Sequence, residues 1–191
     1  MRAFSCWIAA ALVLVTTGAG AAEPAGWVSD SREAARRLGN QLIGELTRAL
    51  ETSPVEAIRV CRERAPLIAA EQGERAGARV GRTALRTRSS ANEPLDWQRR
   101  ALESFASRLE AGASPTSLEY TETAGSGEAT ERRWMKPIMT VPLCLQCHGH
   151  ELAPGIAEVL AAEYPEDRAI GFRVGEMRGA FYVVWRGPTR Q

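Results

Sequence analysis

Histidine, lysine and excess charge are scarce in this sequence of 191 residues. It contains two histidines, Lys136 is its single lysine, and the formal net charge is +1 with arginines and glutamates interspersed. Without a basic excess, nucleic acids and anionic membranes are not indicated as partners. The sequence also has no internal repeat, low-complexity tract or glycine-rich phosphate loop. Repeat architectures and P-loop nucleotide binding are therefore not indicated.

Long hydrophobic runs are absent as well. A stable membrane-spanning helix needs about twenty apolar residues, whereas the apolar run Cys6–Val15 is about half as long. It follows Met1-Arg2 and precedes small residues up to Ala22, which is the order of a secretory signal peptide. We expect residues 1–22 to be cleaved on export to the periplasm, leaving one domain over residues 23–191 without stable membrane insertion. An uncleaved signal acting as an anchor is the alternative.

The stretch Cys144-Leu145-Gln146-Cys147-His148 carries the clearest chemistry in the chain. Cys-x-x-Cys-His is the attachment pattern of c-type haem. Two thiols one helical turn apart can each add to a vinyl group of the macrocycle, and the adjacent imidazole then binds the iron. The pattern predicts one covalently attached haem c, and haem c is attached outside the cytoplasm, in agreement with export. A thioredoxin-type redox couple and a zinc site that also uses His150 are the alternatives.

A lone cysteine raises the question of a second axial ligand. Cys6 leaves with the signal peptide, so Cys61 has no partner thiol once the motif cysteines are used. It is either a small buried apolar residue or an iron ligand on the face opposite His148. His150 is too close to His148 in the chain to reach that face. Water or an open position aside, the sixth-ligand candidates are Cys61 and three methionines, Met135, Met139 and Met177.

The hydrophobic pattern predicts an α+β fold. Apolar residues at helical spacing predict a helix over 29–50, a second that starts at Pro54 and turns Cys61 inward, and others over 94–111, at the motif and over 156–162. Alternating segments predict strands over 78–88, 117–123, 131–138, 169–174 and 180–185, the last of them central. Helices before a late antiparallel sheet are typical of α+β domains.

Arginines recur through the segment 78–88. A solvated edge strand explains them without any ligand. Alternatively, guanidinium groups of Arg82 and Arg86 bind the haem propionates, since their geometry matches carboxylates.

Several short segments resemble one known family, the DUF3365 or Tll0287-like c-type haem proteins. The matching segments, in order, are Val80-Gly81-Arg82-Thr83, Arg88, Asn92-Glu93-Pro94, Trp97, Pro137-Ile138, the haem motif with Gly149, Tyr164–Phe172 and Gly175–Ala180. The resemblance implies a PAS-like antiparallel sheet flanked by helices, with N-terminal helices packing over the haem. It also implies axial ligation by His148 and by a cysteine on an N-terminal helix, which matches Cys61. The chain departs from the family at Ser89-Ser90, where Asn-Pro is usual.

These expectations favour a redox or gas sensor-like haem domain that acts on a separate redox or signalling protein. The alternative is a simple periplasmic electron-transfer cytochrome. An enzyme is not expected, because peroxidase-like chemistry needs an acid–base group on an open distal face, and no histidine remains to supply one.

Overall fold

A computed structural model describes residues 26–187, so the predicted signal peptide lies outside the described residues. The helices are α1 (Gly26–Thr52), α2 (Pro54–Arg59), α3 (Ala65–Ala76), α4 (Asp96–Glu110), α5 (Leu145–His148) and α6 (Pro154–Glu163). The strands are β1 (Arg79–Thr83), β2 (Tyr120–Ala124), β3 (Glu131–Met139) and β4 (Met177–Arg186). A π-helical turn, η1 (Val60–Arg64), joins α2 to α3, and short 3₁₀ turns are η2 (Ser90–Asn92), η3 (Pro115–Ser117), η4 (Gly127–Ala129) and η5 (Pro142–Cys144).

The four strands form one antiparallel sheet in the order β1-β4-β3-β2. Its centre is β4, which pairs with β1 on one side and with β3 on the other. The prediction of a central strand over 180–185 is therefore confirmed, as is the hairpin formed by β2 and β3. With helices on either side of an antiparallel sheet, the α+β fold class is confirmed.

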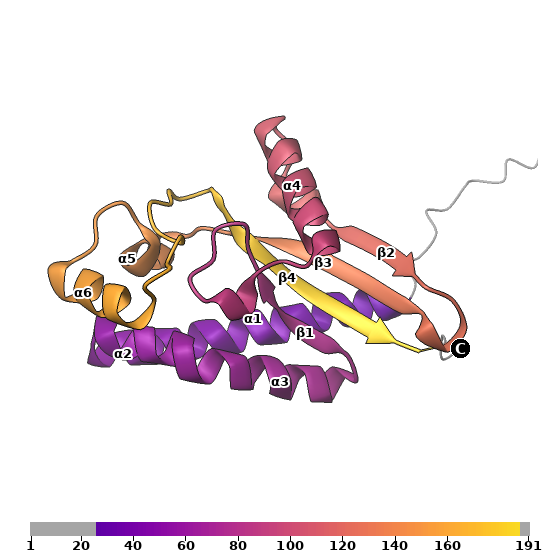
Figure 1. Cartoon of the computed structure of the whole chain (residues 1–191), viewed down its shortest axis with the longest axis horizontal. Helices are drawn as coiled ribbons and strands as arrows, with labels where there is room; N and C mark the ends of the chain where they lie inside the picture. The colour runs from indigo at the N-terminus through magenta and orange to yellow at the C-terminus, as the bar shows by residue number, and fades with distance from the viewer. Residues whose placement is uncertain (1–25, 188–191) are drawn as a thin grey trace, which may run out of the picture.

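Helices cover both faces of the sheet (Figure 1). On one face, α1 and α3 bury Leu38 and Ile68 against Val80, Trp134 and Val183. The periodic apolar stripe of α1 explains this packing, because residues four apart share one face of a helix. The other face packs under α4, in a core made of Trp97, Leu102, Phe105, Met135, Ala180 and Val184. At one end of the molecule, α2 lies against α5 and α6.

The segment predicted as a strand over 169–174 is not a strand, and that prediction is wrong. Its amide groups bond to the motif instead: Phe172 N donates to the carbonyl of His148 at 2.8 Å, and Gly171 N to that of Gly149 at 2.9 Å. Gly171 has a φ of 73°, which breaks an extended conformation. The strand predicted over 78–88 likewise ends at Thr83.

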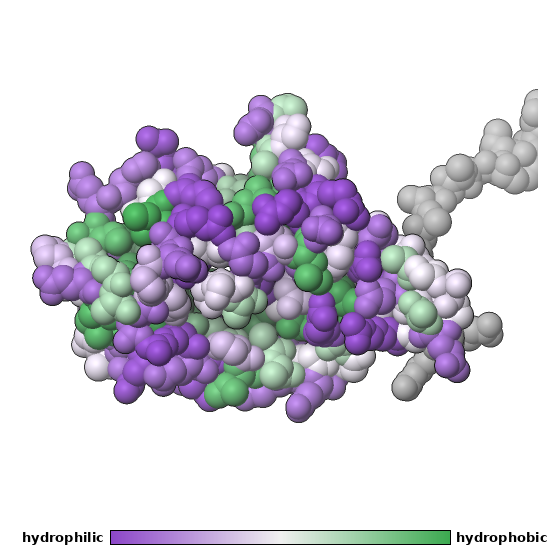
Figure 2. All heavy atoms as spheres, viewed as in Figure 1, coloured by the Kyte–Doolittle hydropathy of each residue, from purple (hydrophilic) through white to green (hydrophobic). Residues whose placement is uncertain are grey.

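Figure 2 shows hydrophilic side chains over much of the visible face, with hydrophobic ones exposed around α5 and α6. Between residues 26 and 187, no helix is long and apolar enough to cross a membrane.

Candidate functional site

The Cys-x-x-Cys-His motif forms one short helical turn at the end of the sheet. Cys144 closes the turn η5 and caps α5, and Cys147 and His148 are the last two residues of that helix. The thiols of Cys144 and Cys147 are free and partly buried. One helical turn thus presents both thiols and the imidazole together. Over the described residues, no group of three or more His, Cys, Asp or Glu side chains is arranged to hold a metal ion.

The ring of His148 is fixed by a backbone carbonyl. Its Nδ1 lies 2.6 Å from the carbonyl oxygen of Ala169. A carbonyl can only accept, so Nδ1 carries the proton and Nε2 keeps its lone pair. Burial, with the charges of Arg178 and Arg88, lowers the pKa of His148 to about 2. The imidazole is therefore neutral, which is the form that binds a metal ion.

A buried ion pair holds the motif from the other side. Arg88 Nε donates to Asp167 Oδ2 at 2.8 Å, and both side chains are about one-tenth exposed. The same guanidinium donates to the carbonyl of Cys147. Asp167 also accepts the amide of Ala169 at 2.7 Å, which places the carbonyl that orients His148. The sequence did not identify Asp167 and Ala169 as parts of the site, because these contacts join segments about twenty residues apart or more.

Cys61 lies in η1, the π-helical turn between α2 and α3. The amide of Ala65 bonds to the carbonyl of Val60, one residue further back than in an α-helix. Pro66 follows directly and has no amide hydrogen, and its ring clashes with the carbonyl four residues earlier, so a wide turn is accommodated here. The continuous helix expected through Cys61 is therefore interrupted at the cysteine. Turns of this kind occur frequently at functional sites.

The structure brings Cys61 and the motif to the same end of the molecule. Ile58, one turn before Cys61, is buried with Ile156 and Leu160 of α6, and Cys147 packs against that cluster. Burial raises the pKa of the Cys147 thiol, and the neighbouring Cys61 and Cys144 raise it further, against the opposing charge of Arg88.

The methionine candidates are placed differently. Met135 is fully buried in the core under α4, the face opposite α1 and α3. Met177 packs against the same core. Met139 is the last residue of β3 and pairs with Met177.

The two predicted arginines have unlike surroundings. Arg86 is exposed; its Nε donates to the carbonyl of Arg168 at 3.2 Å, its Nη2 donates to that of Ile170, and it stacks on Phe172. Arg82 is partly buried, and no hydrogen bond or ion pair joins its guanidinium to another described residue. Burial lowers the pKa of Arg82, while Cys61 and Tyr164 act in the opposite direction. In β1, Arg82 is two residues from Val80 and therefore shares its face of the sheet, which packs against α1 and α3.

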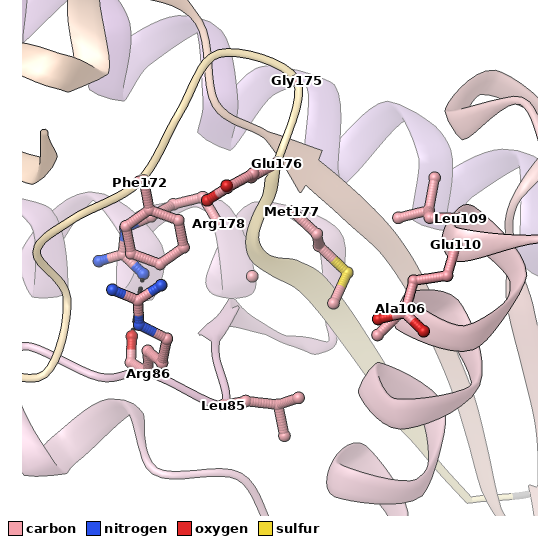
Figure 3. A pocket seen from close by; sticks show the side chains of 11 residues that line it. Leu85, Arg86, Ala106, Leu109, Glu110, Phe172, Gly175, Glu176, Met177 and Arg178 are labelled. Carbon is pink, nitrogen blue, oxygen red and sulfur yellow. Dashed lines mark hydrogen bonds between the residues drawn. The ribbon is translucent and has the colours of Figure 1, made fainter. Parts of the chain in front are cut away.

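A cavity of about 370 Å³ opens between α4 and the start of β4 (Figure 3). Figure 3 shows the ring of Phe172 beside the guanidinium groups of Arg86 and Arg178. Neither Cys61 nor the motif lines this cavity. Its apolar wall is formed by Ala106 and Leu109 of α4, by Met177 of β4 and by Leu85, which follows β1.

Known protein families and solved structures were compared with this chain. The family profile described as Tll0287-like matches residues 21–185. Among solved structures, the crystal structure of the cyanobacterial heme-protein Tll0287 is similar, with a TM-score of 0.62 and 23% sequence identity. The match covers 84% of this chain and 94% of that one. At this identity the likeness shows a shared fold. No curated protein matches the chain.

Proposed function

The chain belongs to the Tll0287-like family, and on that premise we propose that it is an exported c-type cytochrome with one covalently attached haem. Cys144 and Cys147 would form the thioether bonds, and His148 would bind the iron. One observation carries the proposal: the hydrogen bond from His148 Nδ1 to the Ala169 carbonyl, at 2.6 Å. Metal-binding histidines almost always donate their other ring N–H in this way, which leaves Nε2 directed at the metal.

The residues at this end of the molecule fit a haem. Two free thiols and a neutral imidazole share one helical turn. The buried Nε of Arg178 has no hydrogen-bond partner among the described residues, and Arg82 has no counter-ion there, so cations are available for the carboxylates of the macrocycle. Bound haem supplies a one-electron iron centre; the chain supplies attachment, axial ligands and charge.

We further propose that Cys61 binds the iron on the face opposite His148. The support is its place in a π-helical turn and the packing of Cys147 against the cluster that holds Ile58, one turn before Cys61. A thiolate donates electron density and favours Fe(III), so Cys61 should hold its position best in the oxidised state. Its release on reduction would expose a site for a diatomic gas, and this change is the proposed signal.

Mass spectrometry of the protein expressed with the c-type maturation machinery tests the attachment. The mass of the wild-type chain should increase by one haem, and a haem stain should survive denaturing electrophoresis. Cys144→Ala with Cys147→Ala should abolish both, whereas Cys61→Ala should keep both because it removes no thioether. A wild-type chain that carries no haem after this expression would contradict the proposal. The mass of the same sample also reports cleavage near residue 22.

The alternative to the sensor-like role is a periplasmic electron carrier. The partial exposure of the motif favours this alternative, because a haem edge near the protein surface shortens the distance to a redox partner and speeds electron exchange. Spectra of the reduced protein with and without carbon monoxide separate the two. A sensor changes ligation on reduction and binds the gas, while a carrier keeps one six-coordinate spectrum throughout. Either role requires a separate redox or signalling protein as partner, and enzymatic activity is not proposed, because Cys61 would fill the distal position.

A further inference from the structure

Arg178 stands out because a bulge in the sheet positions it. Ile138 of β3 pairs with Gly179 and Met139 with Met177, so Arg178 is the extra residue of β4 at a shift in register. Bulges of this type re-aim a side chain and are over-represented beside active sites. The shift therefore directs Arg178 independently of the alternation that places its neighbours in the two cores.

The guanidinium of Arg178 is buried and incompletely bonded. Its Nη1 donates to the carbonyl of Arg86 at 3.2 Å, and it lies 5.2 Å from the ring centre of Phe172. Its Nε is buried without any hydrogen-bond partner in the described structure. No ion pair joins it to a carboxylate within residues 26–187. A buried donor left unbonded costs about 1–3 kcal/mol, and more when the group is charged.

A second such cation lies on the neighbouring strand. Arg82 of β1 pairs with Phe181 of β4, three residues after Arg178, and it also lacks a protein counter-ion in the described chain. Burial, followed by the charges of Arg88 and Arg82, lowers the pKa of Arg178 to about 10. After burial, the charge of Arg178 is the next cause that lowers the pKa of His148. Asp167, the carboxylate whose charge acts on Arg178, is already paired with Arg88.

The other arginines nearby are already satisfied. Arg88 forms its ion pair with Asp167. Arg86 donates to two backbone carbonyls and remains exposed. Arg86 and Arg178 stack on the same Phe172 ring, at 4.0 Å and 5.2 Å, which makes Arg86 a matched control for stacking alone.

We propose that Arg82 and Arg178 form a partly buried cation pair that binds the two propionates of the haem. This inference rests on the proposed function and assigns Arg178 a binding role in place of Arg86. Two carboxylates on one rigid macrocycle match two guanidinium groups on adjacent strands, and each contact would be a charge-assisted hydrogen bond. The pair would then fix the rotation of the haem between His148 and Cys61.

Redox titration and resonance Raman spectroscopy of haem-loaded variants test the pair. Positive charge near the haem favours the reduced iron, so Arg178→Gln and Arg82→Gln should each shift the oxidised-to-reduced ratio at a fixed potential about tenfold towards Fe(III), which corresponds to about 59 mV for one electron. Both should also move the propionate bending band. Arg86→Gln should change neither, and Arg178→Lys should restore most of the potential but less of the band, because lysine cannot form the planar fork.

Two outcomes overturn the inference. One is an Arg178→Gln variant whose reduction potential and propionate bending band are those of wild type. The other is an Arg86→Gln variant that shifts the potential and the band as much as Arg178→Gln does. If a glutamine variant fails to fold, the wild-type propionate band decides, because unbonded propionates would contradict the pair. Failure of the proposed function looks different: the wild-type chain itself would then carry no covalent haem.

Discussion

At the residue scale, the candidate site depends on groups that orient the proposed ligands as well as on those ligands themselves. Ala169 fixes the tautomer of His148 through its carbonyl, and Asp167 fixes Ala169 through its amide. Asp167 in turn neutralises Arg88, which reaches the carbonyl of Cys147. Loss of any member of this chain of contacts should disturb the motif without removing a ligand.

Asp167→Asn tests the importance of this network. The change leaves the Arg88 charge buried without its counter-ion, and breaking a buried pair costs about 3–5 kcal/mol. We expect the urea midpoint of the haem-loaded protein to fall accordingly with an unchanged slope. Glu45→Gln, which removes the exposed ion pair with Arg48 in α1, should leave the midpoint nearly unchanged. Equal midpoints for the two variants would show that the network is dispensable.

At the element scale, local signals predicted the helices well. Ser53 accepts the amide of Glu56 at 3.1 Å and Pro54 opens α2, as the capping pattern predicts. The π-helical turn at Cys61 was not predicted, because the helical spacing of the apolar residues continues through it and does not reveal that the amide of Ala65 bonds five residues back. The segment 169–174 was assigned wrongly because its amides bond to the motif, a partner about twenty residues away that periodicity cannot reveal.

Pro66→Ala tests whether the wide turn positions Cys61. Alanine restores the amide hydrogen and removes the ring, so η1 can revert to α-helix and rotate Cys61 relative to the haem. We expect the oxidised absorption spectrum to lose its thiolate character. Pro54→Ala is the matched control: proline at the first helical position forgoes only an amide that is unbonded there in any case. Identical spectra for both variants would show that the turn has no such role.

Helix α1 is attached to the sheet by a pH-dependent contact. Arg32 donates to both carboxylate oxygens of Glu119, at 2.8 Å and 2.6 Å, and Lys136 lies 3.7 Å away. The hydrogen bond from Arg32, the largest cause, lowers the pKa of Glu119 below its ordinary 4.5.

A carboxyl group with a lowered folded-state pKa stabilises the fold above its unfolded pKa, and this contribution is lost as the pH falls through the folded value. Glu119→Gln should therefore reduce the unfolding free energy at pH 7 by up to about 1 kcal/mol. The difference from wild type should shrink as the pH falls below 4.5 and through the lowered folded-state pKa of Glu119. Urea titrations at pH 7 and at a series of lower pH values provide the measurement. A difference that grows on acidification would contradict the assigned sign.

At the scale of the whole molecule, two cores on opposite faces of one sheet support the end that carries the motif. Leu38 is fully buried in the α1 core, whereas Ile43, five residues later, is 52% exposed. Leu38→Ala should lower the unfolding free energy by about 2–5 kcal/mol, and Ile43→Ala by less than about 0.5 kcal/mol. Chemical denaturation followed by circular dichroism measures both. A comparable loss in Ile43→Ala would contradict the assigned packing.

The sequence predicted much of this arrangement, for different physical reasons at each site. The motif is contiguous, so Cys144, Cys147 and His148 can be read directly from their spacing. Cys61 could be proposed as the second axial ligand only by counting the cysteines and by using the family resemblance. Arg178 was not singled out, because its position depends on a bulge between β3 and β4, and the pairing of two strands is not encoded in either strand alone.

The proposed ligation of the iron by His148 and Cys61 is tested most directly by the oxidised absorption spectrum of the haem-loaded Cys61→Ala variant. Wild type should show a six-coordinate, low-spin spectrum with thiolate character, and Cys61→Ala should convert it to a high-spin or water-bound form while the haem stays attached through Cys144 and Cys147. Met139→Leu, which removes a rival candidate, should leave the wild-type spectrum unchanged. Identical oxidised spectra for wild type and Cys61→Ala would contradict thiolate ligation.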